Sequence, residues 1–155
     1  MTQVIFYQLT SLPVERALPK VLEKVIEAGF RVHVLTPDEA RTADLNKALW
    51  TYHPQSFLPH GSAVEGNPTK QPIWLSHKRD HENGAQVLAL VDNVFQDELG
   101  AYDKCLYFFS QQYTPGRAKA KEHWQALIQK GYSCTMWLQK ATGSWEKSTQ
   151  FVEEC

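Results

Sequence analysis

A pair of histidines has the type and the spacing that a metal site needs. His77 and His81 lie four residues apart, with Asp80 between them and Glu82 beside them. On a helix the two imidazoles would share a face and could chelate a metal ion, which makes a metal-dependent hydrolase or nuclease one hypothesis. The stretch SHKRDHENGA, however, has no apolar stripe and ends in Asn-Gly, which is typical of a turn between strands. We therefore expect a solvated turn here and no metal site.

The sequence lacks the common motifs of nucleotide-binding and nucleophilic enzymes. The segment TSLPVERAL, which follows the first expected strand, has no glycine and matches neither the dinucleotide nor the P-loop pattern. No Gly-x-Ser-x-Gly stretch is present either. The cysteines Cys105, Cys134 and Cys155 have no zinc or disulfide spacing, and the first two lie in apolar runs where we expect buried free thiols. These motifs therefore give no positive support for an enzyme and point to no cofactor, although a triad assembled from distant parts of the chain stays open.

One segment combines cations with an aromatic ring. The stretch PGRAKAKEHWQALIQKG is predicted to form a helix whose apolar stripe consists of Ala120, Trp124, Leu127 and Ile128. Arg117 and Lys121, four residues apart, lie along one edge of that stripe. A cation next to an indole suits a ligand that has both a carboxylate and an apolar side chain. The alternative is a solvated basic flank beside a core tryptophan.

The block ALWTYHPQSFLPHG carries large apolar side chains on a backbone that prolines interrupt. Neither a long helix nor a central strand tolerates Pro54 together with Pro59. The large apolar residues of the block are Leu49, Trp50, Tyr52, Phe57 and Leu58. They either fold back on the core as a lid or face a partner, since interfaces favour aromatic rings and prolines reduce the entropy lost on docking. The residue pattern leaves both interpretations open.

These groups need a scaffold, and the hydrophobic pattern predicts alternating strands and helices. The expected strands are residues 4–9, 30–35, 73–76, 86–91, 104–109 and 132–139. The order strand-helix-strand-helix at the start indicates a right-handed parallel arrangement. We predict a Rossmann-like α/β fold, a mostly parallel sheet flanked by helices, in a single domain without a phosphate-binding loop.

Capping signals set the expected helix ends. The first helix should begin near Leu18, so that Pro19 falls in its first turn, and should stop at Gly29. Thr36 is expected to cap the second helix, with Glu39 completing a capping box. The inner face of that helix is expected to be Ala40, Ala43, Leu45, Ala48 and Leu49.

Length and charge bound the class of protein. The 155 residues are most simply one domain at residues 1–142, followed by an extension at 143–155 that shows little period and is expected to fray or lie on the surface. The net charge of −1 disfavours a general electrostatic grip on nucleic acid or membrane. No apolar run approaches the ~20 residues of a membrane span, and MTQVIFYQL does not read as a signal peptide. We expect a cytoplasmic protein.

Several stretches make the sequence similar to one family, the chi subunit of bacterial DNA polymerase III holoenzyme. They are FYQL, LNKALWTYHPQSFLPHG, AVEG, PIWLSHKR and GRAKAKEHWQALIQKGY, in the family's order over about residues 1–138. The second is the most specific, because it joins a Leu-x-x-x-Leu-Trp helix end to a Ser-Phe-hydrophobic-Pro-His motif. The resemblance implies a nucleotide-binding-like fold and a non-catalytic, clamp-loader-associated subunit of the bacterial replisome. It implies two partners, the psi subunit and the acidic, Phe-ending C-terminal tail of single-stranded-DNA-binding protein, with DNA contacted mainly indirectly and no membrane partner.

The resemblance also implies which residues bind each partner. The psi contact would use Trp50, Phe57, Leu58, Pro59 and His60. The tail contact would use Arg117, Lys121, Trp124 and Met136. The family often has Lys, Arg and Tyr at positions 117, 121 and 124, so the charges and the ring are kept, but a lysine at 121 cannot bind a carboxylate in a bidentate manner. Direct binding of single-stranded DNA by the basic helix is a further hypothesis, which the net charge makes weaker.

Overall fold

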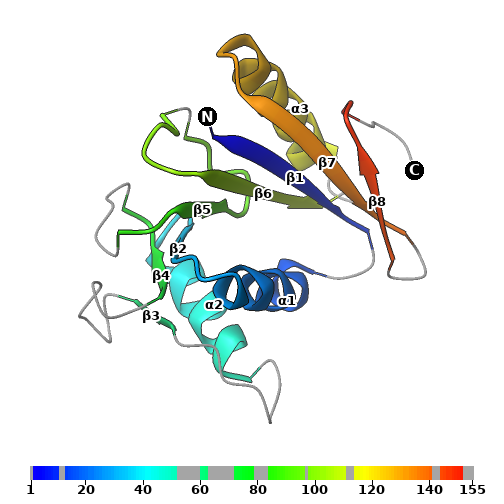
Figure 1. Ribbon diagram of the computed structural model, residues 1–155. Coiled ribbons are helices and arrows are strands. Elements are labelled where there is room, and N and C mark those ends of the chain that lie inside the picture. Colours follow the sequence, from blue (N-terminus) through cyan, green and yellow to red (C-terminus); the bar gives the residue numbers. More distant parts are fainter. Residues whose placement is uncertain are drawn as a thin grey trace.

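The described part of the protein forms one sheet flanked by helices. The computed structural model describes residues 2–10, 13–51, 60–62, 72–78, 84–96, 98–110, 114–140 and 144–151. Its helices are α1 (Val14–Glu27), α2 (Glu39–Thr51) and α3 (Thr114–Gln129). Its strands are β1 (Gln3–Leu9), β2 (Val32–Leu35), β3 (His60–Ser62), β4 (Ile73–Ser76), β5 (Val87–Leu90), β6 (Lys104–Ser110), β7 (Ser133–Gln139) and β8 (Trp145–Ser148) (Figure 1). None of the described helices has the length and hydropathy needed to cross a bilayer.

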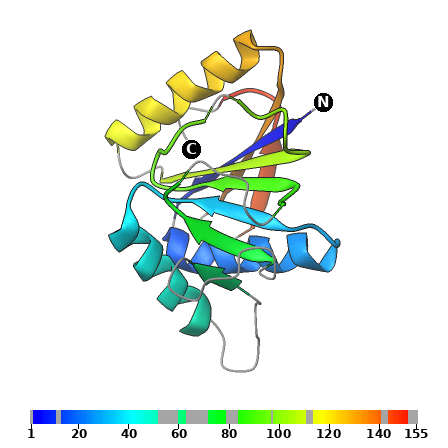
Figure 2. The same cartoon turned by 90° about the vertical axis from the view of Figure 1, so that its left-hand side faces the viewer.

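The sheet confirms the predicted α/β class. The eight strands lie in the order β3-β4-β2-β5-β6-β1-β7-β8. All neighbouring pairs are parallel except β7 and β8, which are antiparallel. The expected strands therefore all exist, although β2 begins at Val32 and β5 at Val87, two residues and one residue later than predicted. Figure 2 shows α3 at one end of the stack of strands and α2 at the other.

Two apolar clusters hold the helices to opposite faces of the sheet. On one face, Leu18 and Leu22 of α1 and Leu45 and Leu49 of α2 pack against β2, β4 and β5. On the other face, Ala120, Trp124 and Leu127 of α3 pack against β1, β6 and β7. The alternation of residues along the strands produces both faces, because successive side chains point to opposite sides.

The first helix begins earlier than the sequence predicted. Its N-cap is Pro13, whose carbonyl accepts the N–H groups of Arg16 at 3.0 Å and Ala17 at 3.1 Å. Pro19 therefore lies inside α1, where it cannot donate an intrahelical hydrogen bond. Its ring is buried with Ala17, Leu18 and Leu22, so tertiary packing outweighs the missing bond. The predicted stop is confirmed, since Gly29 has a positive φ of 90° and follows the C-cap Ala28.

The second helix begins later than predicted, and its cap is Asp38 rather than Thr36. The Asp38 carboxylate accepts the N–H of Arg41 at 2.8 Å, which is the N-cap geometry. The Thr36 hydroxyl is instead buried and lies 2.6 Å from that of Thr42. Of the predicted inner face, Leu45 and Leu49 are buried, whereas Ala40 and Ala43 are exposed. The strand-helix connection simply takes two more residues than the capping pattern indicated.

The extension after residue 142 contains a strand that the sequence pattern did not predict. Residues Trp145–Ser148 form β8, which pairs antiparallel with β7 at the edge of the sheet. Phe151, which follows β8, packs against the α3-side cluster. Part of this extension is therefore ordered and contacts the core.

Candidate protein-docking surface

The helix α3 is held so that one of its sides meets the core and the others remain outside. Ala120 and Leu127 are fully buried and Trp124 is 7% exposed. Two residues after the helix, Gly131 has a φ of 93° and its N–H donates to the carbonyl of Ile128 at 3.0 Å, while the N–H of Tyr132 donates to that of Leu127 at 3.1 Å. This closure, which needs a left-handed residue, turns the chain directly into β7.

Four side chains of α3 line one edge of its buried stripe. Arg117, Lys121, Trp124 and Ile128 are spaced four, three and four residues apart, so they lie in a row along one side of the helix. Arg117 is half-buried, Lys121 is exposed, and Ile128 is 46% exposed. The prediction that Ile128 belongs to the buried stripe is wrong. Ile128 lies at the outer edge of the helix side on which Ala120 and Leu127 are buried. The row therefore combines two cations with a solvent-accessible aliphatic side chain.

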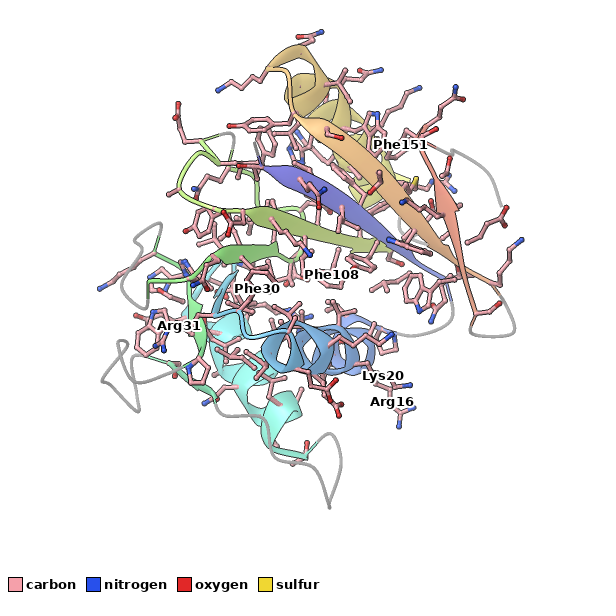
Figure 3. The ribbon with its side chains drawn as sticks, viewed as in Figure 1. Arg16, Lys20, Phe30, Arg31, Phe108 and Phe151 are labelled. Atoms are coloured by element: carbon pink, nitrogen blue, oxygen red, sulfur yellow. The ribbon has the colours of Figure 1, made fainter. Side chains whose placement is uncertain are left out.

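Trp124 belongs to an aromatic cluster. Its ring meets that of Phe6 edge to face, with centroids 5.0 Å apart, and that of Phe151 with centroids 5.8 Å apart. Phe151 also stacks on Phe109, with centroids 5.8 Å apart, and its centroid lies 6.5 Å from that of Phe6. Figure 3 labels Phe151 beside the end of β8. A half-buried ring from the segment after β8 thus covers the core tryptophan.

The other predicted tail-binding residue, Met136, is fully buried. It lies on β7 between Phe6 of β1 and Ser148 of β8 in the sheet register, and it belongs to the cluster beneath α3. The structure therefore brings Arg117 and Lys121 to the surface and keeps Trp124 and Met136 inside. A direct contact of either buried side chain with a partner requires a covering group to move.

The second predicted surface falls largely outside the described residues. Phe57, Leu58 and Pro59 are not described, and only the backbone positions of Trp50 in α2 and His60 in β3 are. These positions nevertheless locate the block. It connects the end of α2 to β3, and β3 is the outermost strand of the sheet on the side away from β8.

A polar network that the sequence did not reveal ties α3 to the loop after β5. The side-chain amide of Asn93 donates to the Tyr107 hydroxyl at 3.0 Å and to the carbonyl of Gly116 at 2.9 Å. The Tyr107 hydroxyl lies 2.5 Å from Nδ1 of His123. The direction of this bond follows the imidazole tautomer, because the hydroxyl can donate to a bare Nδ1 or accept a second hydrogen bond from Nδ1–H. Burial lowers the pKa of His123; Glu122 has a smaller effect that raises it, and Lys119 a smaller effect that lowers it. Phe95 stacks on the imidazole with centroids 4.1 Å apart.

The carboxyl ends of the central strands form a cavity of about 500 Å³, where parallel α/β sheets usually bind ligands. Its cation is Arg41, which forms ion pairs with Glu15 and, at 2.5 Å, with Asp92. Burial alone would lower the pKa of Arg41, but the hydrogen bonds to the two carboxylates raise it. The guanidinium is thus already neutralised, which makes this cavity a poor cradle for phosphate.

The residues of the hypothetical metal site lie mostly outside the described part of the chain. His77 is exposed and its predicted companions Asp80, His81 and Glu82 lie outside the described residues, among which no group of three or more metal-ligating side chains occurs. Cys105 and Cys134 are buried free thiols, as predicted. Burial raises the pKa of Cys134 to about 11, and that of Cys105 further.

Comparison with known proteins gives one consistent family. A family model described as DNA polymerase III chi subunit, HolC, matches residues 1–135. Over 91 residues, 59% of this chain and 55% of the relative, the chain is 34% identical to the probable DNA polymerase III subunit chi of Rickettsia prowazekii. Over 68 residues, 42% of this chain and 48% of the relative, it is 32% identical to the DNA polymerase III subunit chi of Pseudomonas aeruginosa. The chain spans about half the length of the curated relatives it matches.

Proposed function

The chain belongs to the family of the DNA polymerase III chi subunit, and from this membership we propose that it is a non-catalytic accessory subunit of the bacterial replication machinery, acting in the cytoplasm. In this role it bridges the psi subunit, and through it the clamp loader, to the acidic tail of single-stranded-DNA-binding protein. Its contact with DNA is indirect, through that second partner.

The row on α3 is the proposed site for the tail. Arg117 and Lys121 offer two cations one helical turn apart, which suits a terminal carboxylate and the acidic residues near it. Ile128 supplies exposed apolar surface at the other end of the row. Part of this contact is exposed ion pairing, so its affinity should fall as the salt concentration rises.

The block that joins α2 to β3 is the proposed site for psi. Phe57 with Leu58, Pro59 and their neighbours Trp50 and His60 offers aromatic and apolar groups of the kind found at interface cores. Its two ends lie on α2 and on the edge strand β3.

The observation that carries the bridging proposal is the separation of the two surfaces. The proposed psi block leads into β3 at one edge of the sheet. The helix α3, which carries the proposed tail site, packs on β6 and β7 near the other edge. Six strand spacings of about 4.8 Å separate β3 from β7, which gives about 29 Å. Partners bound at α3 and next to β3 would therefore not compete for the same surface.

The test is titration of a labelled acidic peptide with a terminal phenylalanine against the wild type and two charge-reversal variants. Lys121→Glu is expected to weaken binding about five- to tenfold, because it replaces an attraction by a repulsion at an exposed pair. Lys119→Glu is the matched control, since Lys119 is an exposed cation of the same helix on a different side and pairs with Glu122 at 3.6 Å. Equal affinities for Lys121→Glu and the wild type would contradict the site. A shift of bare single-stranded DNA at the same protein concentration would favour direct DNA binding instead.

A further inference from the structure

Phe151 occupies the outer layer of an aromatic stack. Phe6 is fully buried, and Phe109 and Trp124 are 4% and 7% exposed, whereas Phe151, which meets all three rings, is only partly buried. Three of the four rings belong to β1, β6 and α3, and Phe151 alone comes from a segment outside the helices and strands. The three fixed rings therefore form a slot, and Phe151 fills it.

The segment that delivers Phe151 is a short edge strand followed by a turn, tied to the end of β7 by its strand pairing and by an ion pair between Lys140 and Glu146. The strand β8 has four residues, pairs on one side only, and has no buried residue. Its packing anchor is Trp145, whose ring meets that of Tyr7 edge to face with centroids 5.7 Å apart. The connection to Phe151 is a turn in which Gln150 N–H donates to the Ser148 hydroxyl at 3.1 Å. Short edge strands with exposed hydrogen bonds open locally far more readily than core strands.

The chemistry of this segment matches that of the proposed partner. In the sequence Phe151 is followed closely by Glu153 and Glu154, so an apolar ring and carboxylates occur together. On the protein side, the slot borders the row of α3 that carries Arg117 and Lys121, because Trp124 belongs to both. An acidic peptide with a phenylalanine ring carries the same two kinds of group.

We propose that the slot formed by Phe6, Phe109 and Trp124 is a binding site for a phenylalanine side chain, and that Phe151 is its internal occupant. Tail binding then requires Phe151 to leave, which exposes Trp124 to the partner's ring. The proposal rests on the proposed tail-binding function for the identity of the external ligand, while the slot itself depends only on the packing of the four rings. The family match ends at residue 135, so the internal occupant lies outside the matched residues.

The experiment uses the full chain and two peptide probes. The first probe is the acidic, Phe-ending peptide, and the second is a peptide of this chain's own residues 146–154. Phe151→Ala is expected to bind the first probe about tenfold more tightly than the wild type, because an internal occupant lowers apparent affinity by the fraction of time the slot is empty. Gln150→Ala, in the same segment without a ring, is the matched control and should equal the wild type. Phe151→Leu keeps an apolar cover and should lie between them.

The second probe distinguishes failure of the slot proposal from failure of the proposed tail-binding function. It should bind Phe151→Ala but not the wild type, and the same peptide with alanine at position 151 should bind neither. If it binds and the acidic tail peptide does not, the slot stands and the proposed function fails. If the tail peptide binds the wild type and Phe151→Ala with equal affinity, the slot proposal is overturned and the proposed function stands. Binding of neither probe to a Phe151→Ala protein that still unfolds cooperatively overturns both.

Discussion

Replacement of Trp124 by alanine should greatly lower the free energy of unfolding, because the indole is part of the core. The indole is 7% exposed and meets Phe6 with centroids 5.0 Å apart. Burying about 200 Å² of tryptophan surface at about 25 cal/mol per Å² corresponds to about 5 kcal/mol as an upper limit. Tryptophan-to-alanine changes in cores typically destabilise by about 3–5 kcal/mol. We therefore expect Trp124→Ala to lower the free energy of unfolding by about 4 kcal/mol, a large part of the ~5–15 kcal/mol of an ordinary domain.

Urea unfolding followed by circular dichroism measures this change, and Ile128→Ala is its control. Ile128 lies four residues further along the same row but is 46% exposed, so its truncation should change stability by less than about 1 kcal/mol. The thermal midpoint of Trp124→Ala should fall by about 10 °C. A loss below about 1 kcal/mol for Trp124→Ala, or equal losses for the two variants, would refute the placement of the indole under α3. Binding losses of Trp124→Ala are interpretable only at temperatures where the variant is folded.

Three further outcomes follow from the described contacts. Asp38→Ala should destabilise by about 1 kcal/mol in urea unfolding, because it removes the cap of α2, and Asp38→Asn should lose much less. Burial lowers the pKa of His123, so as the pH falls this side chain is protonated in the unfolded chain before it is protonated in the folded protein. The free energy of unfolding should therefore fall as the pH drops through about 6.5. Chemical denaturation across pH should show a smaller loss in His123→Gln. Burial raises the pKa of Cys134 from 9.0 to about 11. The buried neutral thiol therefore contributes its full share of stability below pH 9.0, and this share is lost as the pH rises from 9.0 to about 11. The alkaline loss of stability, measured by chemical denaturation, should be smaller in Cys134→Ala.

The fold class could be predicted from local patterns because the strands are continuous apolar runs and the first helix has a regular stripe. The run around Leu88 and the run around Tyr107 are buried on both faces, as parallel strands covered by helices must be. The first residues of the helices were harder to predict. Pro19 was used as a first-turn marker, yet it lies inside α1, since its ring is accommodated by packing that no local rule includes.

Only part of the arrangement of the candidate site could be predicted from the sequence. The spacing of Arg117 and Lys121 placed them correctly on one edge of α3, because a helical wheel needs only the period. The same wheel could not decide that Ile128 is exposed, since that depends on where the sheet ends beneath the helix. The packing of Phe151 could not be predicted from the sequence, because a single ring after an irregular segment has no period and its partners come from β1, β6 and α3.

Formation of a ternary complex tests the central claim most directly. The chain should be saturated with psi, purified as the complex by size exclusion, and titrated with the labelled acidic tail peptide by fluorescence anisotropy. Attachment of the two surfaces to strands about 29 Å apart predicts one peptide per chain, an affinity within about twofold of that of the chain alone, and retention of psi at peptide saturation. Release of psi by the peptide, or loss of peptide binding in the psi complex, would contradict a bridge built on two separate surfaces.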